Sequence, residues 1–235
     1  MSSEPLILAV ETATLGGSIA LTRGDELIAG VSGDPAVSHS NTLLADVDKL
    51  LQQTAFKLAE VDLFAVAAGP GSFTGLRIGI ATVKALAATL DRPCAAVPTL
   101  QAVALAGGPA ENSVALLPAG RGEVFAQLFS VSADGLVTAL DEPSHISPQK
   151  MIDKYGLLEK AVWCGEGALA QRELIESSAA GKQWRIAAPE KQQPDRLAVQ
   201  VAALALSNWR RNEIVAPDAL QAIYVRPSDA ELKVS

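Results

Sequence analysis

The first third of the chain alternates short apolar runs with polar turns, a pattern typical of β-strands followed by helices. Apolar runs at 6–10, 18–22 and 26–31 predict three strands, and Arg23-Gly24-Asp25 predicts a tight hairpin between the last two. Leucine and valine then recur at helical spacing over 43–51, which predicts a one-sided helix that covers a sheet. A buried strand at 63–68, a glycine-rich loop and a long helix ending near 90 follow.

The second half repeats this order of elements. Strands are predicted at 114–118, 124–130 and 136–140, then a helix at 148–155, a strand at 161–164 and an alanine-rich helix at 195–211. Two halves that each begin with three antiparallel strands predict a duplicated α/β fold of the ribonuclease-H-like, actin-like type. We expect two small domains, 1–107 and 108–235, divided at Gly107-Gly108-Pro109, with a C-terminal segment able to pack back on the first domain.

Composition narrows the class of protein. Hydrophobic residues make up 49% of the 235 residues, enough for a real core, and the formal net charge of −7 argues against a stand-alone nucleic-acid binder. The histidines His39 and His145 and the cysteines Cys94 and Cys164 are too few and too widely spaced for a structural zinc site or a disulfide framework. We expect no metal site, signal peptide or membrane span, and therefore a cytoplasmic protein.

The turn after the first strand is the first candidate phosphate site. It reads Glu11-Thr12-Ala13-Thr14-Leu15-Gly16-Gly17, and its backbone amides and the hydroxyls of Thr12 and Thr14 could bind phosphate while Glu11 holds a metal-bound water. The alternative is an ordinary turn.

The loop Gly69-Pro70-Gly71-Ser72-Phe73-Thr74-Gly75 is the second candidate. It lacks the Lys-Ser/Thr ending of a P-loop and the glycine spacing of a dinucleotide fingerprint. Gly71 and Ser72 precede a helix whose first N–H groups could still face an anion. The alternative is that the glycines let the strand and the helix pack closely.

The helix that follows is apolar almost all the way round. Between Leu76 and Leu90 its polar side chains are Arg77, Thr82, Lys84 and Thr89. Small residues at four-residue spacing allow another helix to approach closely, so we predict a subunit interface, with internal burial as the alternative. The interface residues expected are Gly75, Leu76, Gly79, Ile80, Val83 and Ala87.

Residues for catalysis are scarce. His39, between Ser38 and Ser40, is expected to be a polar residue at the start of a helix, and His145 lies in an irregular segment flanked by prolines, so no catalytic residue is predicted. Arg121 and Glu123, in the turn of the second-half hairpin, are either nucleotide-facing residues or parts of a solvated turn.

Together these segments resemble a known family. The resemblance rests on the runs 8–14, 38–40, 69–79, 97–100, 122–124 and 224–226, of which Gly69-Pro70-Gly71-Ser72-Phe73-Thr74-Gly75-Leu76-Arg77-Ile78-Gly79 is the most specific. In order and spacing they are similar to the TsaB family, also called YeaZ. Two positions depart from the family pattern: Glu11 replaces the usual Asp, and Pro118 stands where the second hairpin usually has Asp.

The resemblance implies an ASKHA-type actin-like fold and a role in making threonylcarbamoyladenosine in tRNA, at the adenosine beside the anticodon. It implies a non-catalytic scaffold or activator that pairs with a TsaD-like catalytic subunit, helps recruit a TsaE-like ATPase, contacts tRNA only within the complex and forms a homodimer when alone. ATP or ADP near the partner interface is a possible ligand. The competing hypothesis is an independent ATPase or sugar-kinase-like phosphotransferase, because the same fold class hosts those activities.

Overall fold

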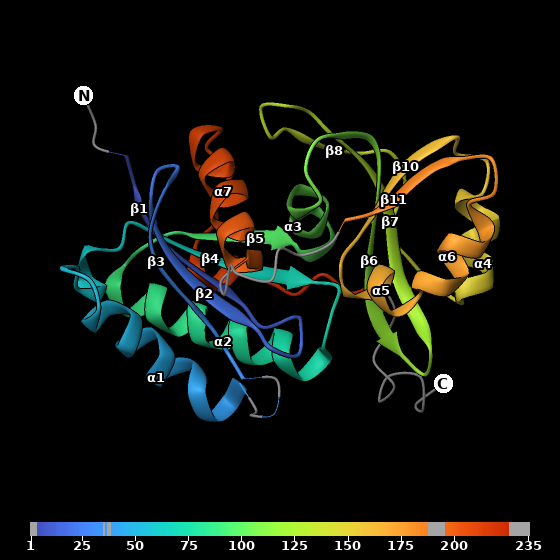
Figure 1. Cartoon of the computed structure of the whole chain (residues 1–235). Helices are drawn as coiled ribbons and strands as arrows, with labels where there is room; N and C mark the ends of the chain where they lie inside the picture. Colours follow the sequence, from blue (N-terminus) through green and yellow to red (C-terminus); the bar gives the residue numbers. More distant parts are fainter. Residues whose placement is uncertain (1–3, 35, 37–38, 188–195, 226–235) are drawn as a thin grey trace. The chain divides into compact units, whose positions relative to one another are not determined.

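The structure is a computed structural model that describes residues 4–34, 36, 39–187 and 196–225 of the chain, with only the backbone described for 39–41 and 196. These residues form two compact units (Figure 1). Unit 1 draws on Met1–Thr99 and Gln192–Ile223, and unit 2 on Leu100–Lys191 and Tyr224–Ser235. Ser38, Asp195 and Arg226, which belong to predicted or quoted segments, lie outside the described residues.

Unit 1 is built on a five-stranded sheet, sheet A, with the order β3-β2-β1-β4-β5. The strands are β1 (Leu6–Glu11), β2 (Ser18–Arg23), β3 (Glu26–Ser32), β4 (Leu63–Gly69) and β5 (Cys94–Pro98). Strands β1 to β3 pair antiparallel, whereas β1, β4 and β5 run parallel. Every residue of β1 and β4 is buried, as expected for central strands with helices on both faces.

Three helices cover sheet A. The helices α1 (His39–Gln52) and α2 (Phe73–Leu90) lie on one face and α7 (Arg196–Arg210) lies on the other (Figure 1). In α1 the buried residues Leu43, Val47 and Leu50 recur every three or four positions, which confirms the one-sided helix. The unit also has two 3₁₀ turns, η1 (Leu58–Glu60) and η2 (Pro217–Ala219).

Unit 2 is built on sheet B, which has six strands. Its path is β11-β10-β6-β7-β8, and β9 pairs with β7 beside this path. The strands are β6 (Ala110–Gly120), β7 (Glu123–Val131), β8 (Val137–Ala139), β9 (Ser144–Ile146), β10 (Lys160–Cys164) and β11 (Gln183–Ile186). The helices are α3 (Thr99–Ala106), α4 (Pro148–Tyr155), α5 (Glu166–Ala170) and α6 (Arg172–Ser178). The core packs around the fully buried Trp163.

The two sheets share one topology. In each, a central strand (β1 or β6) pairs antiparallel with the next strand of its hairpin and parallel with a later strand, β4 or β10. The strand order 3-2-1-4-5 of sheet A corresponds to 8-7-6-10-11 of sheet B. The predicted α/β fold with two similar halves is therefore confirmed.

The division into units differs from the expected boundary at residues 107 and 108. Most of α3 belongs to unit 2 although it directly follows sheet A, and α7 belongs to unit 1 although it follows sheet B. In α7 the buried side chains of Ala198, Val201, Ala202 and Ala205 face sheet A. Each half of the sequence therefore contributes a helix to the other unit, α3 to unit 2 and α7 to unit 1. The order of elements alone does not reveal this exchange.

Candidate functional site

The predicted phosphate turn between β1 and β2 is held together by its own acidic residue. Glu11 is 1% exposed, and its two carboxylate oxygens accept hydrogen bonds from the backbone N–H and the hydroxyl of Thr14, each at 2.8 Å. A carboxylate that takes up the donors of a turn stabilises the turn in the way that an Asx-turn does. This contact gives Glu11 and Thr14 a structural role in the turn.

The next residues of this turn pack directly against the predicted glycine-rich loop. The Thr12 hydroxyl donates to the Gly75 carbonyl at 2.8 Å, and the Ser72 N–H donates to the Ala13 carbonyl at 2.8 Å. A Cβ added at Gly71 would lie 2.6 Å from the Ala13 Cβ, and one at Gly75 would lie 1.9 Å from the Thr12 carbonyl oxygen. The glycines therefore allow the start of α2 to approach the end of β1, the packing alternative of the sequence analysis.

The six residues expected to form an interface lie on the inner side of α2. Gly75, Leu76, Gly79, Ile80, Val83 and Ala87 are all buried within unit 1. A Cβ at Gly79 would lie 2.2 Å from the Thr12 Oγ1, so the small residues accommodate the chain's own strand. Their packing inside unit 1 favours the alternative of internal burial over a subunit contact through these six side chains.

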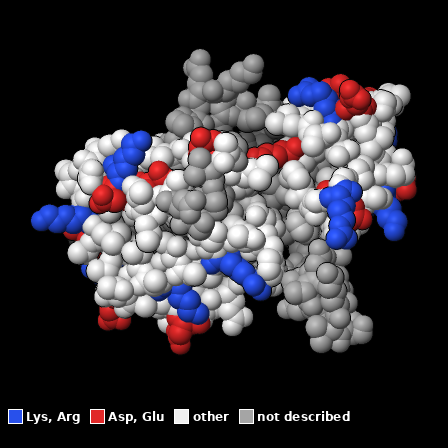
Figure 2. Space-filling view, turned by 90° about the horizontal axis from the view of Figure 1, so that it is seen from below, with Lys and Arg blue, Asp and Glu red and all other residues white. Residues whose placement is uncertain are grey.

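The outer side of α2 is exposed and carries mostly small residues. Thr74, Ala81, Ala85 and Ala88 are exposed, and the Arg77 guanidinium stacks on the Phe73 ring with 3.9 Å to its centroid. Figure 2, which views the molecule from the side of α1 and α2, shows Lys, Arg, Asp and Glu side chains scattered among uncharged residues. By length and composition α2 could cross a membrane, with a mean hydropathy of 1.3, but in unit 1 its inner side packs into the core on sheet A and 28% of the helix is buried.

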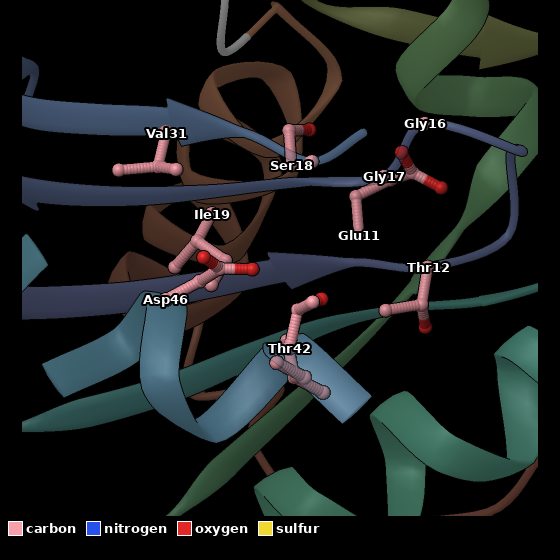
Figure 3. A pocket seen from close by; sticks show the side chains of 11 residues that line it. Glu11, Thr12, Gly16, Gly17, Ser18, Ile19, Val31, Thr42 and Asp46 are labelled. Atoms are coloured by element: carbon pink, nitrogen blue, oxygen red, sulfur yellow. The ribbon is translucent and has the colours of Figure 1, made fainter. Parts of the chain in front are cut away.

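A shallow hollow lies beside the β1–β2 turn, between the sheet and α1 (Figure 3). The hollow encloses only about 10 Å³, far below the roughly 300–1,000 Å³ of typical ligand pockets. Glu11 from β1 and Thr42 and Asp46 from α1 are among its lining residues. Two acidic side chains in one small hollow oppose the entry of a phosphate group.

The remaining candidates, Arg121 and Glu123, belong to the β6–β7 hairpin of unit 2. Arg121 is exposed and adopts φ 52° between two glycines that also have positive φ. The Glu123 Oε2 lies 2.8 Å from the His145 Nε2, and His145 stacks against Phe125 with 5.2 Å between ring centroids. These contacts tie strand β9 to the hairpin, a role that the sequence did not suggest for Glu123 or His145.

The cysteines and acidic residues form no metal site in the part of the chain that the structure describes, since no three His, Cys, Asp or Glu side chains are grouped there. Burial raises the pKa of the Cys94 and Cys164 thiols to about 11. Both thiols are therefore protonated and poorly nucleophilic near neutral pH.

Comparison with known proteins identifies the relatives of the chain. Residues 34–220 match the family model of TsaD, described as tRNA N6-adenosine threonylcarbamoyltransferase. The chain is 35% identical over 124 residues to the tRNA threonylcarbamoyladenosine biosynthesis protein TsaB of Bacillus subtilis, which covers 52% of this chain and 54% of that protein. It is 30% identical over 146 residues to the Escherichia coli TsaB, covering 61% and 63%. The chain thus spans between half and two thirds of these relatives' length in the alignments.

The fold comparison covers more of the chain. The structure of YeaZ from Pseudomonas aeruginosa superposes with a TM-score of 0.76 at 25% identity, covering 94% of this chain and 99% of that one. The two-unit fold with two mixed sheets is therefore the YeaZ-like ASKHA fold. The family-model match and this superposition agree with the motif order in the sequence, and the chain belongs to the TsaB/YeaZ family, the relatives of TsaD.

Proposed function

We propose that the chain is a non-catalytic subunit of the machinery that makes threonylcarbamoyladenosine in tRNA, and that it supports a TsaD-like transferase as scaffold and activator. Its TsaB relatives are named tRNA threonylcarbamoyladenosine biosynthesis proteins, which supports a role for the chain in making this modification. The Glu11 carboxylate already accepts two hydrogen bonds from Thr14, and the hollow beside it is small. An independent ATPase or kinase needs a carboxylate available to hold magnesium near the phosphates, so these two features favour a scaffold.

The observation that carries the proposal is the exposed outer face of α2. We define this docking face by Phe73, Arg77, Ala81, Ala85 and Ala88. Alanine side chains let the backbone of a partner helix come close, and the Phe73 ring adds apolar area at one end of the face. An apolar helix face of this kind gains free energy when a partner covers it.

The face suits a TsaD-like subunit because that protein shares the fold of this chain, so that its equivalent helix could pair with α2. In the absence of TsaD, a second copy of the chain would occupy the same face and give a homodimer. The further parts of the proposal are a TsaE-like ATPase recruited to the pair, tRNA bound only through the complex, and a cytoplasmic location. The net charge of −7 supports the placement of tRNA on another subunit.

Complex formation with the TsaD-type transferase of the same genome tests the proposal. We expect the wild-type chain to co-elute with the transferase in size-exclusion chromatography. Ala81→Arg and Ala85→Arg place a long cation on the docking face, and each should weaken the complex by at least about tenfold. Arginine is a good helix former, so α2 itself should be preserved.

The matched control is Ala133→Arg, the same substitution at an exposed turn of unit 2. It should leave the complex intact. Co-elution of both α2 variants at wild-type affinity would exclude the docking face. ATP turnover by the chain alone, abolished by Glu11→Gln, would favour the independent ATPase instead.

A further inference from the structure

After α7 the chain returns to sheet A and crosses it as a strap, Val215–Ile223. The strap is fixed at both ends by backbone hydrogen bonds. Cys94 on β5 and Val215 exchange two bonds of 2.8 Å, and the Ile223 N–H donates to the Ala68 carbonyl of β4 at 2.7 Å. A Cβ at Gly69 would lie 2.2 Å from the Ile223 carbonyl oxygen, so the glycine after β4 makes room for the strap.

The middle of the strap is held by α2. Leu220 is 2% exposed and belongs to the core of unit 1. The Lys84 ammonium, on α2, lies 2.9 Å from the Asp218 carbonyl oxygen and 3.5 Å from the Leu220 carbonyl oxygen, so it can donate to both. A charged donor that serves two backbone acceptors forms stronger hydrogen bonds than a neutral one.

Lys84 therefore connects the strap to the helix that carries the docking face. It is half-buried and lies one position before Ala85. Burial raises the pKa of the nearby Cys94 thiol, which stays protonated near neutral pH and so offers the Lys84 ammonium no negative charge. The two carbonyl oxygens of the strap account for the direction of the Lys84 side chain.

We propose that Lys84 is a positioning residue, which fastens the strap to α2 so that helix and strap present the docking face as one rigid body. This inference rests on the proposed function for its docking part, whereas the fastening of the strap is a property of the chain alone. Loss of the ammonium should free the middle of the strap and let the nearby part of α2 move. The partner would then have to immobilise this part when it binds, which weakens the complex.

Hydrogen exchange of the full-length chain, combined with binding to the TsaD-type transferase, tests the inference. Lys84→Met keeps the length and the apolar stem but removes the donors, and Lys84→Arg keeps a charged donor. We expect Lys84→Met to raise exchange at the Leu220 and Ile223 amides about tenfold and to weaken the complex about tenfold. Lys84→Arg should bring the exchange rates and the affinity for the transferase most of the way back to the wild-type values. Lys150→Met, at an exposed lysine of α4, should change neither the exchange rates nor the affinity.

Each outcome decides a separate point. Unchanged exchange in Lys84→Met overturns the fastening of the strap. Faster exchange with unchanged affinity overturns the link to docking. If the wild-type chain fails to bind the transferase, the proposed function fails and the docking part of the inference falls with it, while the exchange result still decides the fastening.

Discussion

At the scale of single residues, the spacing of Gly71, Gly75 and Gly79 is explained by what lies opposite them. Each glycine faces Thr12 or Ala13 at the end of β1, and an added Cβ at any of them would lie within 2.6 Å of an atom there. The sequence shows that something approaches this side of the helix closely. It cannot show whether that neighbour is another chain or a strand of the same unit, because small residues permit both.

Gly75→Ala separates two opposing effects on stability. Alanine is the better helix former by about 1 kcal/mol, so propensity alone predicts stabilisation. The new Cβ would, however, lie 1.9 Å from a backbone carbonyl oxygen, and we expect a net loss of about 1–3 kcal/mol in the free energy of unfolding. Urea denaturation measures it, with the neighbouring exposed Thr74→Ala as control. A stabilised Gly75→Ala would contradict the close packing.

The buried thiol of Cys164 predicts how stability depends on alkaline pH. Its pKa is about 11 in the folded chain, above the ordinary value near 8.5 in an unfolded chain. The unfolded state therefore loses the proton first, and the stability that this thiol contributes is complete below about pH 8.5 and is lost as the pH rises towards 11.

The test is urea denaturation of the wild type and of Cys164→Ala between pH 8 and 11. Other groups titrate in this range in both proteins, so the difference between the two curves isolates the thiol. The wild type should lose about 2–3 kcal/mol more than the variant across the range. Parallel curves would show that the thiol is not desolvated as its burial indicates.

At the scale of elements, periodicity predicted the long helices and the first strands but missed short or atypical ones. The predicted helix 148–155 agrees with α4, and the strands at 6–10 and 18–22 agree with β1 and β2 within one residue. The sequence analysis assigned no strand to β5, β9 or β11, which are three to five residues long, too short to show a period. In α2 the exposed side is largely alanine and threonine, so composition alone cannot distinguish its two faces.

Asp141, between β8 and β9, connects strand β7 with helix α4 in unit 2. Its carboxylate accepts from the Leu128 N–H at 2.6 Å and the Tyr155 hydroxyl at 3.0 Å, and pairs with the Lys154 ammonium at 2.7 Å. Burial, together with the carboxylate, raises the pKa of Tyr155 well above its usual range. Tyr155 therefore stays protonated and keeps its donor role.

Asp141→Ala should leave buried donors on β7 and α4 without an acceptor. We expect a loss of about 2–4 kcal/mol in the free energy of unfolding, because charged and partly buried acceptors are costly to remove. Unfolding is followed by the fluorescence of Trp163 and Trp184, which lie 4.9 Å apart in the core of unit 2. Asp153→Ala, which removes only an exposed contact with Gln149, is the control and should cost less than about 0.5 kcal/mol. Equal losses in the two variants would contradict this role of Asp141.

At the scale of the whole molecule, the duplication was readable from the sequence but the exchange of helices was not. Both halves repeat the same run of strands, whereas the assignment of α3 and α7 to units depends on which sheet buries their apolar sides. The candidate site was predicted only in part. The sequence located the two loops that meet at Thr12 and Ala13, yet their contact with each other is structural. The docking face that we propose lies on the side of α2 opposite to the residues predicted for an interface.

The central claim, that this chain acts by docking its outer α2 face on a catalytic partner, is tested most directly by reconstituted tRNA modification. The TsaD-type transferase and the other components are assayed for threonylcarbamoyladenosine formation without this chain, with the wild type, with Ala85→Arg and with Ala133→Arg. We predict strong stimulation by the wild type and by Ala133→Arg, and at least about tenfold less by Ala85→Arg at limiting concentration. Equal stimulation by all three proteins, or none by the wild type, would contradict the account.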